Sequence, residues 1–256
     1  MRTGGSITGR VIRDLDSPGG AAWNMAVDQA LLQAVAGGAA PTLRFYRWQE
    51  PTLSLGYFQS LADRVHHAAS AAAPVVRRCS GGGAILHDRE LTYSLIVPIG
   101  DRTSSKVQDL VRRMHDSIRG AFALANISLA SVADSGVAAE GSTFLCFQRR
   151  ASEDLLCAGY KVVGSAQRRT AGAVLQHGSI LLAASEKAPE LPGIGDLVGR
   201  RIEMDQLVDG ILDQFQQRHE GVGQWRVGGL EAEERQVAQQ QVVERFENPS
   251  WLNRRP

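Results

Sequence analysis

The sequence lacks three features that would each point to a particular class of protein. No apolar run approaches the ~18 residues of a membrane-spanning helix, and the first 20 residues hold no apolar core of a secretion signal. The formal net charge is only +1, which gives no reason to expect nucleic acid or a membrane as a partner. The three cysteines show no CxxC spacing, which argues against a disulfide framework or a zinc site. We therefore expect a cytoplasmic protein that binds no metal, no membrane and no nucleic acid.

Lysine is also scarce. Of the 28 basic residues only Lys106, Lys161 and Lys187 are lysines, and the other 25 are arginines. An amine can lose its proton in suitable surroundings, whereas a guanidinium cannot. Chance can retain any one lysine, but a chain that uses arginine almost everywhere makes each lysine a candidate for proton transfer.

The length of 256 residues and the hydrophobic content of 43% suit one main domain. Helical spacing of apolar residues predicts a helix over residues 21–35. Asn24 and Asp28 lie four apart on it, and a solvated polar face accounts for them as well as a functional role does. Residues 43–48 and 52–57 are predicted to be two strands of a hairpin.

The most informative stretch is RRCSGGGAILHD, residues 77–88. Residues 74–76 before it and 91–97 after it have the pattern of strands, so the loop is held at both ends. Three successive glycines leave backbone N–H groups open to a ligand, and Arg77 and Arg78 can each fork onto a carboxylate or phosphate. This combination is typical of a cradle for an anion or an acyl group.

A second stretch combines a hairpin with small and polar residues. Residues 154–157 and 160–163 flank Ala158-Gly159, a two-residue turn, and GSAQ follows directly. A further strand is predicted over residues 173–182, which include LQHGSILL. Strand alternation alone does not fix which face of the sheet Lys161 takes.

The segments RRCSGGGAILHD, GYKVVGSAQRR and LQHGSILL, in this order and spacing, resemble the lipoate-protein ligase and octanoyltransferase family. The resemblance covers roughly residues 20–182. It implies an α+β fold of the biotin/lipoate protein ligase type, with a mixed, mainly antiparallel sheet and packed helices. Residues 1–256 are then a single catalytic domain, with 183–256 a helical C-terminal extension in which 221–229 link two helices.

The family contains two activities. Lipoate-protein ligases use ATP and Mg to activate free lipoate, and then acylate a lysine of a lipoyl domain. Octanoyltransferases move an octanoyl (or lipoyl) group from acyl carrier protein through a cysteine thioester and require no cofactor. Their acceptors are lipoyl domains or the glycine-cleavage carrier protein.

The sequence favours the transferase. HDRELTYSLIVP resembles that branch, and so does the position of Leu145-Cys146-Phe147 shortly before GYK. Gln148-Arg149-Arg150 departs from its pattern, and the intact glycine triplet also suits a ligase that accommodates an adenylate. The ligase therefore remains the alternative. A protein that only held an acyl group, without turnover, would need neither Cys146 nor Lys161.

The resemblance places the nucleophile at Cys146. A free thiol is only a few per cent thiolate at pH 7, and a neighbouring positive charge such as that of Lys161 raises this fraction. Presenting an acceptor lysine as the free amine at pH 7 costs roughly 4.6 kcal/mol, so some group has to take its proton. We assign proton transfer and oxyanion stabilisation to Lys161, whereas His177 either orients the site or is a satisfied strand histidine. Cys79 and Cys157 are assigned to packing.

The remaining assignments concern binding. Ile85 and Leu86 are expected to form part of the wall of an acyl slot. Ordinary solvated charge explains Arg149-Arg150 and Arg168-Arg169 pair by pair, but together these pairs would steer an acidic carrier protein. The residues assigned to substrate binding all belong to the three motifs: Arg77, Arg78, Gly81, Gly82, Gly83, Ala84, His87, Gly164, Ser165, Ala166, Gln167, His177, Gly178 and Ser179.

Overall fold

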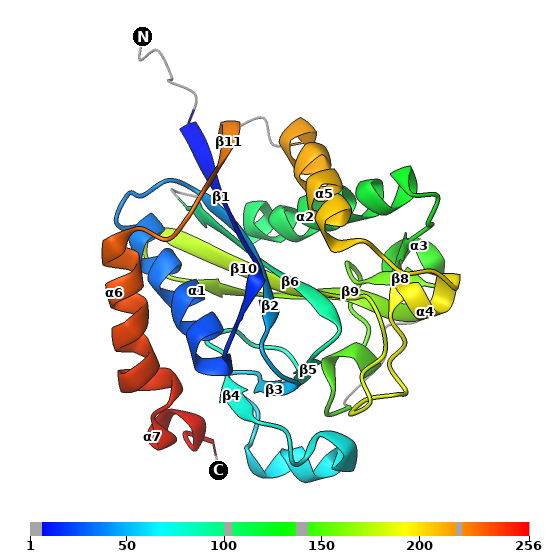
Figure 1. Ribbon diagram of the computed structural model, residues 1–256, viewed down its shortest axis with the longest axis horizontal. Coiled ribbons are helices and arrows are strands. Elements are labelled where there is room, and N and C mark those ends of the chain that lie inside the picture. The colour runs from blue at the N-terminus through cyan, green and yellow to red at the C-terminus, as the bar shows by residue number, and fades with distance from the viewer. Residues whose placement is uncertain (1–6, 100–103, 137–142, 219–221, 256) are drawn as a thin grey trace.

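The computed structural model describes residues 7–99, 104–136, 143–218 and 222–255. Within them, eight strands form the main sheet in the order β11-β1-β2-β6-β10-β9-β8-β7 (Figure 1). β1 pairs in parallel with β2 and β11, whereas the other neighbouring pairs are antiparallel. The bounds are β1 Ile7–Gly19, β2 Thr42–Trp48, β6 Glu90–Pro98, β7 Ala130–Ser131, β8 Leu155–Cys157, β9 Tyr160–Arg169, β10 Ala173–Leu181 and β11 Val222–Gly228.

A second, small sheet has the order β4-β3-β5. Its strands are β3 (Thr52–Leu55), β4 (Val75–Arg77) and β5 (Ile85–His87), and the short 3₁₀ helices η1 (Ala62–His66) and η2 (Ala68–Ser70) join β3 to β4. The glycine-rich loop connects β4 to β5. Both of its ends are thus anchored in this sheet.

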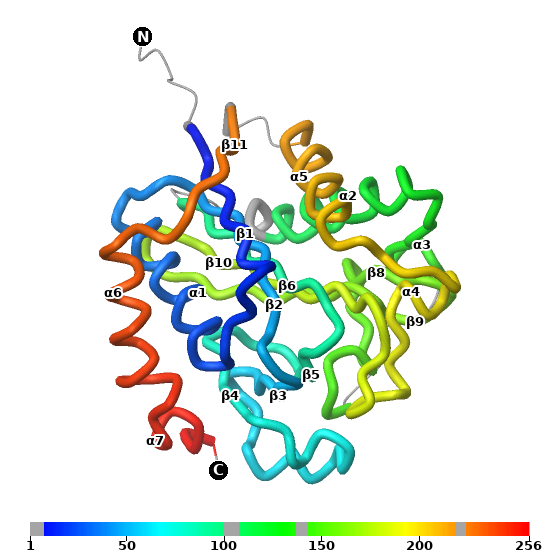
Figure 2. The backbone as a smooth tube through the Cα atoms, in the orientation of Figure 1, coloured from blue at the N-terminus to red at the C-terminus, as the bar shows by residue number. Residues whose placement is uncertain are grey.

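Helices cover both faces of the main sheet (Figures 1 and 2). α1 (Ala21–Ala36) and α6 (Ala232–Gln241) lie on one face, and α2 (Ser104–Leu124) and α5 (Met204–Arg218) on the other. Because strand side chains alternate, Leu43 and Phe45 pack toward α2 and α5, whereas Tyr46 and Trp48 pack toward α1. The shorter helices are α3 (Val132–Ser135), α4 (Ile194–Val198), α7 (Pro249–Leu252), η3 (Cys146–Gln148) and η4 (Val242–Phe246).

The mixed, mainly antiparallel sheet with packed helices confirms the predicted fold class. The hairpin of β8 and β9 is also confirmed. Its turn residues Ala158 and Gly159 have φ values of +47° and +84°, the left-handed pair that a two-residue turn between twisted strands requires. This hairpin carries Lys161 near its tip.

The predicted hairpin of residues 43–48 and 52–57 is wrong. β2 hydrogen-bonds to β1 on one edge and to β6 on the other, so neither edge is free for β3. The chain instead turns at Pro51, and β3 becomes the centre of the small sheet, parallel to β4 and antiparallel to β5.

β1 continues to Gly19, which pairs with Trp48 after a register shift. The C-terminal part of the chain differs from expectation. The C-terminal part is not purely helical, because the segment expected to link two helices forms β11, the parallel edge strand beside β1. α6 then packs on α1, and the chain ends beside β4 (Figure 2). The C-terminal residues are therefore part of the main sheet and not only an extension packed on it.

Candidate active site

Cys146 begins the one-turn helix η3, which the glycine loop holds in place. Ala84 N–H donates to Phe144 O at 3.0 Å, and Cys146 N–H donates to Ala84 O at 2.7 Å. A Cβ at Gly83 would lie 3.0 Å from Cys146 N and 3.1 Å from its Cα. Gly83 is thus the residue that permits this close approach. Gly83 and Ala84, which were assigned to substrate binding, position the segment that carries Cys146.

Lys161 meets Cys146 from the neighbouring strand β9. Its Nζ lies 3.7 Å from Cys146 Sγ, and it donates to Cys146 O at 3.2 Å. Asp154 pairs with the same ammonium through an Oδ2–Nζ contact of 2.6 Å. A Cβ at Gly164 would lie 2.7 Å from Lys161 Cε, so a side chain there would shift the end of the lysine chain. We call Cys146, Asp154 and Lys161 the reactive corner.

Asp154 was not among the expected site residues. Its Oδ2 accepts a hydrogen bond from Ala151 N–H at 2.7 Å, which fixes the carboxylate beside the lysine. In the hairpin Leu156 pairs with Lys161, and Asp154 stands two residues before Leu156. Same-face diagonal neighbours in a hairpin can touch, so the turn at Ala158-Gly159 was the signal that could have found Asp154.

A pocket opens beside Cys146. It brings together most of the residues expected from the three motifs, and adds Met25, Tyr46 and Thr92, which were not among the expected site residues. The complete lining is Met25, Tyr46, Arg78, Gly82, Ile85, His87, Thr92, Cys146, Gly164, Ser165, Ala166, His177, Gly178 and Ser179.

Several expected residues do not line this pocket. Arg77 is fully buried and donates to the backbone carbonyls of Gly56, Gln59 and Leu252 at 2.6–3.0 Å. It fastens the C-terminal residues to the small sheet and does not stand at the pocket entrance. Gln167 donates to Gln176 Oε1 at 3.2 Å. Gly81, Gly83, Ala84 and Leu86 are likewise absent from the lining.

Arg78 organises the glycine loop from inside. Its guanidinium donates to Ser54 O and Oγ, both at 2.7 Å, and to the carbonyls of Gly81 and Gly83 at 3.0 and 2.9 Å. Burial lowers the pKa of Arg78 to about 10, which still leaves the group charged at pH 7. The loop therefore curves around a fixed cation.

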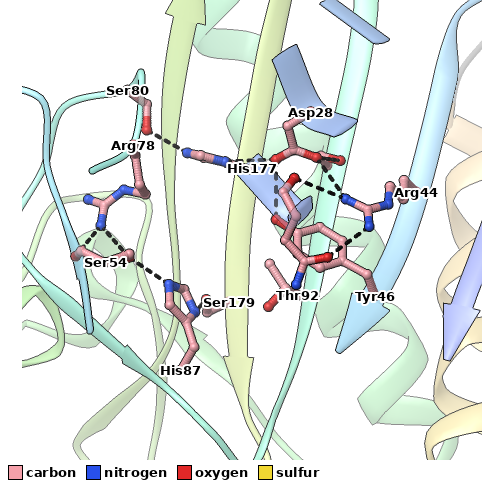
Figure 3. Close-up of polar contacts among 12 residues, drawn as sticks. Asp28, Arg44, Tyr46, Ser54, Arg78, Ser80, His87, Thr92, His177 and Ser179 are labelled. Carbon is pink, nitrogen blue, oxygen red and sulfur yellow. Dashed lines mark hydrogen bonds and ion pairs between the residues drawn. The ribbon is translucent and has the colours of Figure 1, made fainter. Parts of the chain in front are cut away.

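His177 lies in a buried chain of polar groups (Figure 3). Its Nδ1 bonds Asp28 Oδ2 at 3.1 Å, and its Nε2 bonds Ser80 Oγ. Arg44 pairs with Asp28 at 3.3 Å, and Asp28 is only 2% exposed, so α1 does not present it on a solvated face. Burial alone would raise the pKa of Asp28, but the hydrogen bond from His177 and the Arg44 charge hold it below its usual value.

His87 stands in a second chain of the same kind (Figure 3). Its Nδ1 bonds Glu90 Oε1 and its Nε2 bonds Ser54 Oγ, both at 2.6 Å, while its ring stacks on Trp48 with 3.9 Å between centroids. Ser179 Oγ donates to the same Glu90 oxygen at 2.9 Å. Burial lowers the pKa of His87 despite the carboxylate, which keeps the ring neutral at pH 7. We call Asp28, Arg44, His87, Glu90 and His177 the polar wall.

Across the described ranges, no group of three or more His, Cys, Asp or Glu side chains is placed to hold a metal ion. No helix in them is both long and apolar enough to cross a membrane. Cys146 lines the pocket, and beside its thiol stand the Lys161 ammonium and the Asp154 carboxylate, neither of which is part of the lining.

Comparison with known proteins identifies relatives that match most of the chain. Octanoyltransferase LipM of Moorella thermoacetica is 33% identical over 91% of this chain and 93% of its own length. The enzyme of the same name from Oceanobacillus iheyensis is 38% identical over 66% of this chain and 62% of its own length. Among solved structures, a bipartite lipoate protein ligase from Thermoplasma acidophilum has a TM-score of 0.73 at 18% identity, covering 96% of this chain and 97% of that one. Residues 20–248 match the lipoyl protein ligase A/B catalytic domain. The resemblance expected from three short motifs is thus confirmed, and the chain belongs to the lipoyl protein ligase A/B catalytic domain family.

Proposed function

We propose that this protein is an octanoyltransferase that moves an octanoyl group from an acyl carrier protein to Cys146, and from there to a lysine of a lipoyl domain in protein lipoylation. The activity follows from the octanoyltransferase relatives that match along almost the whole chain. The observation that carries the mechanism is the 3.7 Å contact between Cys146 Sγ and Lys161 Nζ at the pocket.

In the first step the Cys146 thiolate attacks the carbonyl carbon of the donor thioester. The new C–S bond forms to Sγ, the bond to the carrier sulfur breaks, and the departing thiolate takes a proton from the Lys161 ammonium. An ammonium next to a sulfur favours the thiolate form, which is the nucleophile. Asp154 at 2.6 Å holds the amine in place for both proton transfers.

In the second step the acceptor lysine enters as the free amine. Its nitrogen attacks the octanoyl-Cys146 carbonyl, the C–S bond breaks, and the proton released from nitrogen passes to the neutral Lys161. The products are an amide, a Cys146 thiolate and a Lys161 ammonium, so the starting pair is restored. Exchange between thioesters is nearly isoenergetic and formation of an amide runs downhill, so this route consumes no ATP.

The pocket suits the acyl chain. Met25, Ile85 and Tyr46 offer apolar surface beside Cys146, and each buried methylene contributes roughly 0.8 kcal/mol to binding. Hydrogen bonds among its polar side chains hold His87 and His177 in the wall. Side chains already held by such bonds do not have to give up partners when an apolar chain enters the slot.

The test is the intact mass of the purified protein after mixing with octanoyl-acyl carrier protein without ATP. We expect an octanoyl adduct that hydroxylamine removes, that is absent from Cys146→Ala and that persists in Cys157→Ala, whose thiol lies in the core between β8 and its neighbours. A second incubation with a lipoyl domain should discharge the adduct. An absent adduct, with ATP and free lipoate required to modify the domain, would establish the ligase instead.

A further inference from the structure

Three arginines from distant parts of the chain gather around two aromatic rings. Arg168, near the end of β9, lies over Tyr57 with 5.5 Å between Cζ and the ring centroid. Arg254, just after α7, lies over the same ring at 3.9 Å and over Trp251 at 4.9 Å. Arg245 from η4 lies over Trp251 at 5.0 Å. We call Arg168, Arg245 and Arg254, with Tyr57 and Trp251, the arginine patch.

The arginine patch has no carboxylate partner among the described residues. In the part of the chain that the structure describes, none of its three guanidinium groups forms an ion pair with a carboxylate. Burial and the nearby charges of Arg254 and Arg255 lower the pKa of Arg77. Like charges held together at an exposed site are unfavourable until an anion binds between them.

The arginine patch is continuous with the pocket. Tyr57 N–H donates to Ser80 O, one residue before the glycine triplet. Phe58, whose exposure of 70% is unusual for a large apolar residue, stands next to Tyr57 and within 4.0 Å of a Cβ built at Gly81. The glycine loop itself lies over β9, because Gly82 and Ala166 both line the pocket and approach each other.

Strand β9 runs from the reactive corner to the arginine patch, so its rise per residue gives the distance between them. The Lys161 ammonium lies alongside Gly164, where a Cβ would be 3.0 Å from Nζ. Arg168 follows four residues later on the same strand, which corresponds to roughly 13 Å at the rise of an extended strand. The distance from the reacting sulfur to the patch is therefore about that of four extended residues.

We propose that the arginine patch binds the phosphate of the phosphopantetheine arm by which an acidic carrier protein presents the donor acyl group. This rests on the proposed function and names how its donor is recognised. The arm runs over thirteen bonds from phosphorus to sulfur and spans roughly 16 Å when extended, about the length of the track along β9. Guanidinium forks bind phosphate oxygens in pairs, and the carrier's acidic surface is attracted by the same charge.

The length also distinguishes donor from acceptor. An acceptor lysine side chain has five bonds from Cα to Nζ and reaches only about 6 Å. Its domain must therefore sit directly over the reactive corner, whereas a donor on a long arm can be anchored at the arginine patch. The two substrates would then approach Cys146 from different sides.

The experiment measures adduct formation from three octanoyl donors by the wild-type protein and by the variant Arg168→Glu/Arg254→Glu. Both altered side chains are exposed. For octanoyl-acyl carrier protein we expect kcat/KM of adduct formation to fall about 10²-fold at low salt, mainly through KM, and the loss to shrink at high salt. For octanoyl-phosphopantetheine it should fall by about 10-fold. For octanoyl-N-acetylcysteamine, which has no phosphate, it should stay within about twofold. Arg226→Glu, an exposed arginine on β11, is the matched control and should leave all three rates unchanged.

Three outcomes would overturn the inference. Equal losses with all donors would mean that the arginine patch supports the fold or Cys146 itself. Wild-type rates of the variant with octanoyl-phosphopantetheine would mean that the arginine patch does not bind the phosphate. Normal adduct formation followed by slow discharge to the lipoyl domain would assign the arginine patch to the acceptor. If instead the wild-type protein forms no adduct with any donor, the proposed function fails as well, and the two failures are thereby distinguished.

Discussion

The polar wall reaches the pocket through His87 and His177, and the reactive corner reaches it through Cys146, but the two regions are built differently. In the polar wall nearly every group is buried and held by two or more partners, as with His177 between Asp28 and Ser80. In the reactive corner Cys146 Sγ contacts only the Lys161 amine among the hydrogen bonds of the described residues. Tight mutual pairing stabilises the polar wall, whereas a lightly held sulfur is left free to react. Substitutions should therefore separate stability from activity according to the region they touch.

The largest separation is expected for Lys161→Arg. The arginine keeps a positive charge near Asp154 but cannot take the acceptor's proton, so transfer to the lipoyl domain should fall by about 10² to 10⁴-fold. The free energy of unfolding should change little. Discharge of preformed octanoyl-enzyme, followed by mass, isolates this step. Lys187→Arg is the matched control, and a discharge rate in Lys161→Arg equal to that control would remove Lys161 from proton transfer.

Arg44→Met should show the opposite pattern. Arg44 is 1% exposed and bonds Asp14, Asn24 and Asp28, so its loss leaves the buried Asp28 carboxylate short of a partner. Removing one member of a buried pair costs about 3–5 kcal/mol of stability. Urea unfolding measures this directly. Arg113→Met, which breaks an exposed ion pair with Asp109, should cost less than about 1 kcal/mol. Similar costs for the two variants would mean that the buried network does not stabilise the fold.

Gly164→Ala tests whether adduct formation depends on the position of the Lys161 amine. The added methyl group would stand 2.7 Å from Lys161 Cε and must displace the lysine chain from Cys146. A misplacement of about 1 Å in a catalytic group can reduce a rate by about 10²-fold. We expect that loss in adduct formation, with far-UV circular dichroism unchanged. Gly229→Ala is the comparison, because nothing lies within 4 Å of a Cβ there and its φ is not left-handed. An unaltered adduct rate in Gly164→Ala would show that Lys161 tolerates displacement.

The two regions also differ in how far the sequence predicts them. Short local patterns singled out Cys146 and Lys161, and the structure brings their side chains within 3.7 Å of each other. Arg77 and Arg78 were both assigned to the pocket, yet backbone carbonyls hold Arg77 at the end of β4, and only Arg78, the residue after β4, reaches the pocket.

The polar wall was harder to foresee. Asp28 meets His177 149 positions later in the chain, and only the completed sheet brings them together. The same holds for the failed hairpin of β2 and β3, since the strands that occupy both edges of β2 come from elsewhere in the chain. Local patterns thus predict local chemistry, and non-local pairing decides the rest.

The smallest expected effect is on stability against pH. Burial lowers the folded-state pKa of His87 in the polar wall and of His115, which packs against Ser165 behind the reactive corner. Below about pH 6.5 these histidines bind protons in the unfolded chain but stay neutral in the folded protein. The free energy of unfolding should therefore fall as pH drops toward the folded-state pKa values. Each histidine contributes at most about 1.4 kcal/mol per pH unit in that window. Urea unfolding at pH 7.5, 6.5 and 5.5 measures the slope, which His87→Asn and His115→Asn should each reduce. His66→Gln, with its side chain 66% exposed, should leave it unchanged. A free energy of unfolding that does not change from pH 7.5 to 5.5 would mean that the fold keeps neither ring neutral. The polar wall would then accept a charged histidine without loss of stability.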